Sequence, residues 1–242
     1  MPAIKLFQED AYLKSAKATV IYAGPDGVRL DQTIFYAMSG GQPGDTGVLR
    51  WSGGEARVID TRKWNGEGEP EDIIHVLAEG SPLPSAGETV EMALDWERRY
   101  AHMKIHTCMH LLCSLIGDVA VTGGQVSADK GRLDFNMPSG AFDKQTLTEG
   151  LNRLIAEGHA VSFRWITDEE LAAQPDLVRT MKVKPPTGTG RVRLVSIEEN
   201  IDLQPCGGTH VRRTGEIGPV EVVKIENKGK QNRRVIIMPR VA

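Results

Sequence analysis

Two short motifs, far apart in the chain, constrain this 242-residue sequence more than any other feature. The first places His106 and His110 four residues apart in an apolar segment that is predicted to be helical, so their imidazoles share one helix face. The second, Cys206-Gly-Gly-Thr-His210, repeats this spacing, but its two glycines favour a tight turn over a helix. If the two motifs meet in space, they form a Cys/His₃ set of four metal ligands.

The donor types narrow the chemistry of such a site. One thiolate and three imidazoles suit zinc better than magnesium or calcium. Residue 107 is threonine, so the segment lacks the glutamate that serves as general base in His-Glu-x-x-His peptidases, and we do not expect a peptidase. His102 lies on the same helix face and remains a rival ligand by spacing alone. Four protein ligands would close a structural site, whereas an open position would favour catalysis, and the sequence leaves both open.

Composition bounds the class of protein. The chain is 40% hydrophobic and 25% charged, which is typical of a globular protein with a sizeable core. Three cysteines, an odd number, indicate a reducing compartment and thiols that serve as ligands or core residues. The sequence contains no apolar run of the length that a signal peptide or membrane helix needs. We therefore expect a cytoplasmic protein without membrane association, and no obligatory protein partner is evident.

Charge is unevenly distributed along the chain. Residues 179–242 carry 13 Lys/Arg against 6 Asp/Glu, whereas residues 1–178 carry 16 against 26. The basic end can bind a polyanion, although a solvated basic face explains the same pattern.

The first part of the chain is predicted to be a β-rich module, because short strands alternate with Gly/Pro breaks. We expect strands at residues 18–22, 28–36, 47–51, 56–61 and 88–94, arranged as a small barrel or sandwich. The module contains the loop Ser39-Gly-Gly-Gln-Pro-Gly-Asp45. Its glycines would let backbone N–H groups approach a phosphate or ribose, but a simple turn requires the same residues.

The second part is predicted to be α+β, with helices on a mostly antiparallel sheet. Asp95 is expected to cap a helix over residues 96–116, and Asp143 one over residues 144–157 that ends at Gly158. Thr167 and Glu170 form a capping box for a short helix that stops before Pro175. Further strands are expected at residues 119–125, 132–136, 160–166, 192–197, 220–225 and 235–238.

Taken in order, the glycine loop, His106-Thr-Cys-Met-His110-Leu-Leu and Cys206-Gly-Gly-Thr-His210 closely resemble the editing domain of alanyl-tRNA synthetases and the free-standing AlaX proteins. The resemblance covers almost the whole chain, and the length is that of the medium AlaX form. It implies an N-terminal β-barrel in residues 1–94 and an α+β editing domain of the threonyl/alanyl-tRNA synthetase type in residues 95–242.

The resemblance also implies an activity: hydrolysis of mischarged tRNA(Ala), with Ser-tRNA(Ala) as the expected substrate and one zinc ion per chain. It implies that the four motif residues bind zinc, which leaves His102 as a helix residue or a support for a ligand. The ion would polarise the ester carbonyl, lower the pKa of the attacking water, or orient the substrate. The chain is expected to be a deacylase and not an ATP-dependent ligase, because it has no room for an aminoacylation domain.

Further site residues follow from the same resemblance. Thr33, together with Gly40, Gly41 and Gln42, is assigned to the catalytic site, with Thr33 as the reader of the serine hydroxyl. The acceptor-stem phosphates are expected to bind basic residues near the C-terminus: Lys182, Lys184, Lys228, Lys230, Arg233 and Arg234. No general base is assigned. Two alternatives remain: a deacylase for Gly-tRNA(Ala) or another small amino acid, and a non-catalytic tRNA-binding module in which zinc only supports the fold.

Overall fold

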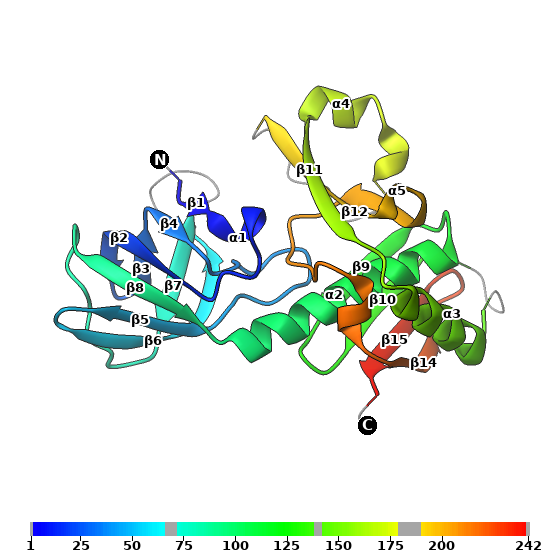
Figure 1. Ribbon diagram of the computed structural model, residues 1–242, viewed down its shortest axis with the longest axis horizontal. Coiled ribbons are helices and arrows are strands. Elements are labelled where there is room, and N and C mark those ends of the chain that lie inside the picture. Colours follow the sequence, from blue (N-terminus) through cyan, green and yellow to red (C-terminus); the bar gives the residue numbers. More distant parts are fainter. Residues whose placement is uncertain (1, 66–71, 138–141, 179–189, 241–242) are drawn as a thin grey trace. The chain divides into compact units, whose positions relative to one another are not determined.

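The computed structural model describes residues 2–65, 72–137, 142–178 and 190–240. The chain folds into two compact units, Met1–Tyr100 and Ala101–Ala242 (Figure 1). The expected division between residues 94 and 95 falls directly before helix α2 (Trp96–Ile116). The boundary between the two compact units along the chain, after Tyr100, falls inside that helix.

The first unit is built on a closed six-stranded barrel. Neighbouring strands follow the order β2 (Ser15–Gly24), β3 (Gly27–Leu30), β7 (Ile73–Leu77), β6 (Gly54–Lys63), β5 (Gly47–Trp51) and β8 (Thr89–Leu94). Closure pairs β2 with β8, so the barrel has no unpaired edge. Of the two all-β architectures that the strand pattern allowed, the chain adopts the barrel.

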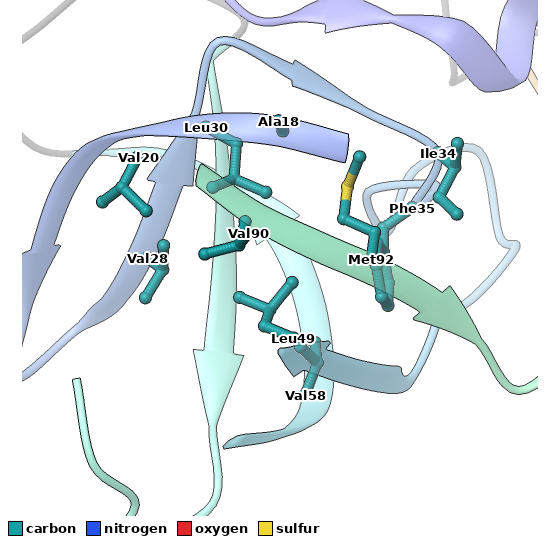
Figure 2. Packing of buried hydrophobic residues seen from close by; sticks show 10 residues of the cluster. All are labelled: Ala18, Val20, Val28, Leu30, Ile34, Phe35, Leu49, Val58, Val90 and Met92. Carbon is teal, nitrogen blue, oxygen red and sulfur yellow. The ribbon is translucent and has the colours of Figure 1, made fainter. Parts of the chain in front are cut away.

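Alternating side chains fill the barrel interior. Along β8, Val90 and Met92 are fully buried while Thr89 and Glu91 are exposed, which is the period-two pattern of a strand with one face in the core. Figure 2 shows these side chains packed against those of the other strands and against Ile34 and Phe35. The cluster comprises Ala18, Val20, Val28, Leu30, Ile34, Phe35, Leu49, Val58, Val90 and Met92.

The single strand expected over residues 28–36 is interrupted. Strand β3 ends at Leu30, and β4 (Gln32–Thr33) pairs in parallel with β1 (Ile4–Lys5), which precedes helix α1 (Leu6–Glu9). The break falls at Asp31, whose carboxylate Oδ1 accepts a hydrogen bond from the Thr19 amide at 2.8 Å. Asp31 therefore bonds with its side chain where a continuing strand would use only the backbone.

The second unit contains two antiparallel sheets. One has the strand order β14 (Val220–Asn227), β15 (Arg233–Pro239), β10 (Gly131–Phe135) and β9 (Val121–Val126). The other has the order β11 (Val161–Thr167), β12 (Arg191–Ile197) and β13 (Asp202–Pro205). Strand β13 was not predicted, because it is only four residues long and contains Asp and Pro, which are depleted in strands.

Helix ends match the capping residues in the sequence. Asp143 accepts a hydrogen bond from the Thr146 amide and begins α3 (Lys144–Glu157), which ends at the left-handed Gly158. Thr167 and Glu170 form the predicted capping box of α4 (Asp168–Ala172). Asp95 directly precedes α2, but its carboxylate accepts hydrogen bonds from Thr46 and Arg57. The remaining short helices are α5 (Glu198–Ile201), η1 (Pro175–Leu177) and η2 (Thr214–Ile217).

Helix α3 packs on β14, one of the two edge strands of the four-stranded sheet (Figure 1). The Asn152 amide group donates to Val220 O at 2.8 Å and accepts from Val220 N at 2.9 Å, and Thr148 Oγ1 accepts from Val222 N at 3.0 Å. Helix side chains thus bond the backbone groups that an edge strand leaves open. Across the described part of the chain, no helix has both the length and the apolar character that crossing a membrane requires.

Candidate metal centre

Helix α2 supplies two of the predicted ligands from a buried face. His106 and His110 lie one turn apart, their ring centroids separated by 5.4 Å, and both are at most 9% exposed. Ile105, Met109 and Leu112 on the same helix are buried in the core. Packing of the apolar residues therefore fixes the helix rotation that aims both imidazoles inward.

The turn of residues 206–210, which we call the ligand turn, supplies the other two. It follows β13 and is not helical, as predicted. Cys206 Sγ lies 3.3 Å from His210 Nε2 and 3.6 Å from His106 Nε2. The His210 ring centroid lies 4.4 Å from that of His106 and 4.6 Å from that of His110. The four predicted ligands therefore come together within the second unit.

Thr107 fixes the tautomer of His210. Its hydroxyl donates its one proton to Met103 O at 2.9 Å, so it accepts from the Val211 amide at 3.3 Å and from His210 Nδ1 at 3.1 Å. His210 therefore carries its proton on Nδ1 and presents the Nε2 lone pair toward Cys206. The sequence showed only that residue 107 is not the glutamate of a His-Glu-x-x-His peptidase motif. The role of Thr107 in orienting a candidate ligand becomes visible in the tertiary structure.

Asp202 plays the corresponding part for His110. Its carboxylate Oδ2 accepts from His110 Nδ1 at 2.7 Å and from Gln204 Nε2 at 2.9 Å, and the residue is 2% exposed. Burial lowers the pKa of His110, but the bonds to Asp202 and Cys206 and their charges outweigh it and raise the pKa to about 10. A carboxylate that holds the Nδ1 proton orients the ring and raises its basicity, which would strengthen the bond from Nε2 to a metal ion that displaces the second proton. Asp202 and Gln204 were not predicted as site residues, because both lie on the short strand β13, outside the two ligand motifs.

The charges of the other donors fit a metal site. Burial alone would raise the pKa of the Cys206 thiol, but the His106 imidazole beside the sulfur holds that pKa well below its ordinary value. Burial lowers the pKa of His210 to about 3, so this imidazole is neutral. A thiolate and neutral imidazoles are the forms that bind metal ions.

The donor geometry accommodates one ion. All four ligand atoms lie within 4.8 Å of one another. Around a tetrahedral zinc ion such atoms are roughly 3.3–3.8 Å apart, a spacing that small side-chain shifts reach from here. His102 is also buried but does not belong to this cluster.

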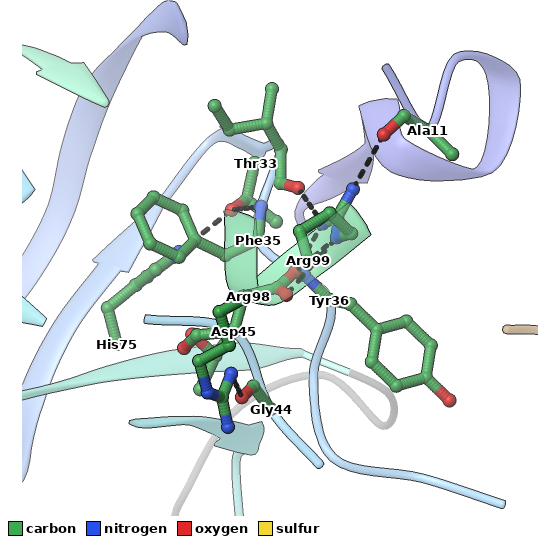
Figure 3. A network of polar contacts seen from close by, with 11 residues as sticks. Ala11, Thr33, Phe35, Tyr36, Gly44, Asp45, His75, Arg98 and Arg99 are labelled. Carbon is green, nitrogen blue, oxygen red and sulfur yellow. Dashed lines mark hydrogen bonds and ion pairs between the residues drawn. The ribbon is translucent and has the colours of Figure 1, made fainter. Parts of the chain in front are cut away.

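In the first unit, the Thr33 hydroxyl belongs to a buried hydrogen-bond chain (Figure 3). His75 Nδ1 lies 2.9 Å from Val28 O, which can only accept, so His75 is protonated there and its Nε2 accepts from Thr33 Oγ1 at 2.8 Å. Burial lowers the pKa of His75 to about 4, which keeps the ring neutral. Thr33 Oγ1 also accepts from Phe35 N at 3.0 Å. Its proton is thus committed, and one acceptor lone pair is left.

The glycine loop beside this chain is anchored by a buried ion pair. Arg99 bonds the Asp45 carboxylate and donates to Ile34 O and Ala11 O, and Asp45 accepts from Tyr36 N (Figure 3). Both charged side chains are 1% exposed.

Within the loop, Gly40 and Gly41 are exposed with φ of 56° and 84°, which favours glycine, whereas Gln42 is fully buried. Gly44 approaches Thr61 so closely that a Cβ would lie 2.0 Å from Thr61 O.

The predicted phosphate-binding residues differ in their surroundings. Lys230 is exposed, and Lys228 is exposed with its ammonium 3.1 Å from Glu226. Arg234 donates two hydrogen bonds to Asp134, at 2.7 and 2.9 Å. Arg233 is 6% exposed and donates to Gly229 O and Asn232 O. Lys182 and Lys184 lie outside the described residues.

Comparison with known proteins matches both units to translation proteins. The family described as "Threonyl and Alanyl tRNA synthetase second additional domain" matches residues 192–236, and "tRNA synthetases class II (A)" matches residues 4–98. The alanyl-tRNA editing protein AlaX-M of Methanosarcina mazei is 36% identical, over 95% of this chain and 94% of the relative. The AlaX-M protein of Methanosarcina acetivorans is 37% identical, over 95% and 96%. The alanine–tRNA ligase of Pyrobaculum calidifontis is 38% identical over 92% of this chain, which spans 25% of that ligase.

Proposed function

Because the chain belongs to the AlaX-M family of alanyl-tRNA editing proteins, we propose that it hydrolyses the ester bond of Ser-tRNA(Ala) at a zinc site formed by His106, His110, Cys206 and His210. Membership of this family makes the chain an aminoacyl-tRNA deacylase and not an ATP-dependent ligase. The observation that carries the proposal is the convergence of four metal-binding donors, two of them held by Thr107 and Asp202.

In the reaction, a water oxygen bonds to the ester carbonyl carbon, the bond from that carbon to the ribose oxygen breaks, and the ribose oxygen takes up a proton. The products are free serine and tRNA. Bound zinc supplies Lewis-acid chemistry for this step. The chain's own residues set the conditions for it: Thr107 and Asp202 accept the protons on Nδ1 of His210 and His110, which would leave each Nε2 to bind the ion.

Specificity against Ala-tRNA(Ala) requires a group that senses one hydroxyl. A site that hydrogen-bonds a substrate hydroxyl discriminates against an analogue lacking it far better than an apolar pocket rejects an extra group. We assign this role to Thr33. Since its proton is committed to His75, Thr33 Oγ1 would accept a hydrogen bond, and the serine hydroxyl would donate it. Gly40, Gly41 and Gln42 would contribute backbone groups near the terminal nucleotide.

The phosphates of the acceptor stem would bind the basic residues named above. Lys228 and Lys230, both exposed, are suited to direct contact. Arg233 and Arg234 are the first two residues of β15. They would act mainly by stabilising the start of that strand, because their guanidinium groups already bond other residues of the chain.

A panel of mischarged tRNAs tests the function. Purified protein is mixed with tRNA(Ala) carrying serine, glycine or alanine, before and after chelation and after zinc is restored. We expect serine release that is fastest among the three, is lost on chelation and returns with zinc. If glycine is released faster than serine, Gly-tRNA(Ala) replaces Ser-tRNA(Ala) as the proposed substrate. If zinc-loaded protein releases no amino acid from any of the three, the chain is a tRNA-binding module and not a deacylase.

A further inference from the structure

Arg193 contacts the ligand turn without belonging to the metal ligands. It lies on β12, the central strand of its sheet, and is 8% exposed. Its Nη1 donates to Gly208 O at 3.0 Å and to Cys206 O at 3.2 Å. Its own backbone oxygen accepts from the Cys206 amide at 3.0 Å, which extends the pairing of β12 with β13 into the turn.

Phe163 covers the guanidinium group from the edge strand β11. The Arg193 Cζ lies 4.4 Å from the centre of the Phe163 ring, and Phe163 is 36% exposed. Arg193 is the cross-strand partner of Trp165, so Phe163 occupies the diagonal position on the same face of the sheet. The cation–π contact shields the hydrogen bonds to the turn from water.

The two carbonyl oxygens belong to the peptide groups that follow Cys206 and Gly208, one before Gly207 and the other after Gly208. Glycine restricts rotation of its neighbouring peptide groups less than any other residue does. One nitrogen that bonds both carbonyls removes this freedom. Cys206 directly precedes Gly207, and His210 lies two residues after Gly208. The directions of both side chains therefore depend on the backbone of the two glycines.

We propose that Arg193 is a positioning residue that preorganises the ligand turn, so that Cys206 Sγ and His210 Nε2 are in place before the metal ion binds. The inference rests on the proposed metal occupancy. It predicts that loss of the Arg193 guanidinium group weakens metal binding even though all four candidate ligands remain.

Arg191 supplies a matched control. It lies two residues before Arg193 on β12 and stacks on Trp165 with its Cζ 4.4 Å from the ring centre, the same distance as in the pair of Arg193 and Phe163. Arg191 is exposed at the start of the strand. Replacing it removes an equal charge and an equal stacking contact from the same sheet.

The test compares Arg193→Met, Arg193→Lys and Arg191→Met by titration of the metal-free proteins with Co²⁺, using the thiolate-to-cobalt absorption band as the signal. We expect Arg193→Met to bind Co²⁺ roughly 10–100-fold more weakly than the wild type. Arg193→Lys keeps the charge but not the planar guanidinium group, and we expect a loss of Co²⁺ affinity between those of the wild type and Arg193→Met. Arg191→Met should match the wild type. An Arg193→Met protein with wild-type affinity and band intensity would overturn the inference.

Hydrogen exchange of the same metal-free proteins separates this inference from the proposed function. Arg193→Met should speed amide exchange in residues 206–210 and leave the barrel strands unchanged, whereas Arg191→Met should change neither. If the wild type binds no Co²⁺, the proposed metal function fails while the exchange rates still test the positioning role. Equal rates in the ligand turn of both variants would refute that role.

Discussion

At the scale of single residues, one hydroxyl group orients a candidate metal ligand. Thr107 donates to Met103 O and accepts from His210 Nδ1. Replacement by valine would keep the shape but remove the acceptor of the His210 proton. We expect Thr107→Val to weaken Co²⁺ binding by roughly 10–100-fold and Thr107→Ser to stay near the wild type, as measured by the same titration. Equal affinities of the two variants would contradict the role of Thr107.

Thr33 gives a second prediction at this scale. If its lone pair accepts the serine hydroxyl, Thr33→Val should lower the ratio of serine to alanine release while metal content is unchanged. Single-turnover deacylation of the two substrates measures the ratio, and Thr33→Ser, which retains the hydroxyl, is the matched control. An unchanged ratio in Thr33→Val would assign Thr33 to the fold alone.

His75 makes the stability of the protein depend on pH. Its folded pKa of about 4 lies below the ordinary value of 6.5, because the ring is fully buried. Between pH 6.5 and 4 the unfolded chain therefore binds a proton that the folded protein does not, and the free energy of unfolding falls as the pH falls through that window. One such group contributes at most about 1.4 kcal/mol per pH unit.

Urea unfolding of the wild type and His75→Gln at several pH values within this window measures the contribution. Glutamine can still donate to Val28 O but cannot titrate. We expect His75→Gln to be less stable at pH 7 and to lose less stability on acidification. Parallel curves for the two proteins would show that His75 does not cause the dependence.

At the scale of elements, helix caps were readable in the sequence because they are local. Asp143 satisfies the Thr146 amide at the first turn of α3, a helix that also bonds the edge strand β14. Asp143→Ala should lower the free energy of unfolding by about 1 kcal/mol, and Asp143→Ser should recover most of it. Thermal unfolding with metal-loaded protein measures both. A loss that serine does not recover would point to some other role of the carboxylate.

The elements that sequence patterns missed are those whose bonds are not local. Residues 28–36 have the composition of one strand, but Asp31 bonds to Thr19 on β2 and the strand breaks there. The four residues of β13 have little strand character and become a strand because β12 supplies a paired neighbour. Both outcomes depend on partners distant in sequence, which a local pattern does not contain.

At the scale of the whole molecule, the charge asymmetry suits a polyanionic substrate. We expect tRNA affinity to fall as salt concentration rises, because phosphate contacts release counterions. Lys230→Ala should weaken tRNA binding and reduce the salt dependence without changing stability, since the side chain is exposed. Arg234→Ala should instead destabilise the fold, because it leaves the partly buried Asp134 without its two hydrogen bonds.

Binding measurements at several salt concentrations, with thermal unfolding of the same variants, separate these effects. Lys17→Ala on the barrel strand β2, another exposed lysine, controls for the loss of one charge. If Lys17→Ala and Lys230→Ala weaken binding equally, the effect reflects net charge and not a specific phosphate contact.

The sequence by itself identified the candidate metal ligands, the main helices with the caps of α3 and α4, and most of the barrel strands. These features follow from spacing, periodicity and donor chemistry within short segments, and the order of the motifs along the chain identified the family. Only the tertiary structure decided which groups orient the ligands. Thr107 bonds His210 across 103 residues and Asp202 bonds His110 across 92, while Arg193 fixes the turn from a neighbouring strand. Threonine, aspartate and arginine are common at many positions, and their roles arise only when folding places their polar atoms within hydrogen-bonding distance of a ligand or of the backbone that carries it.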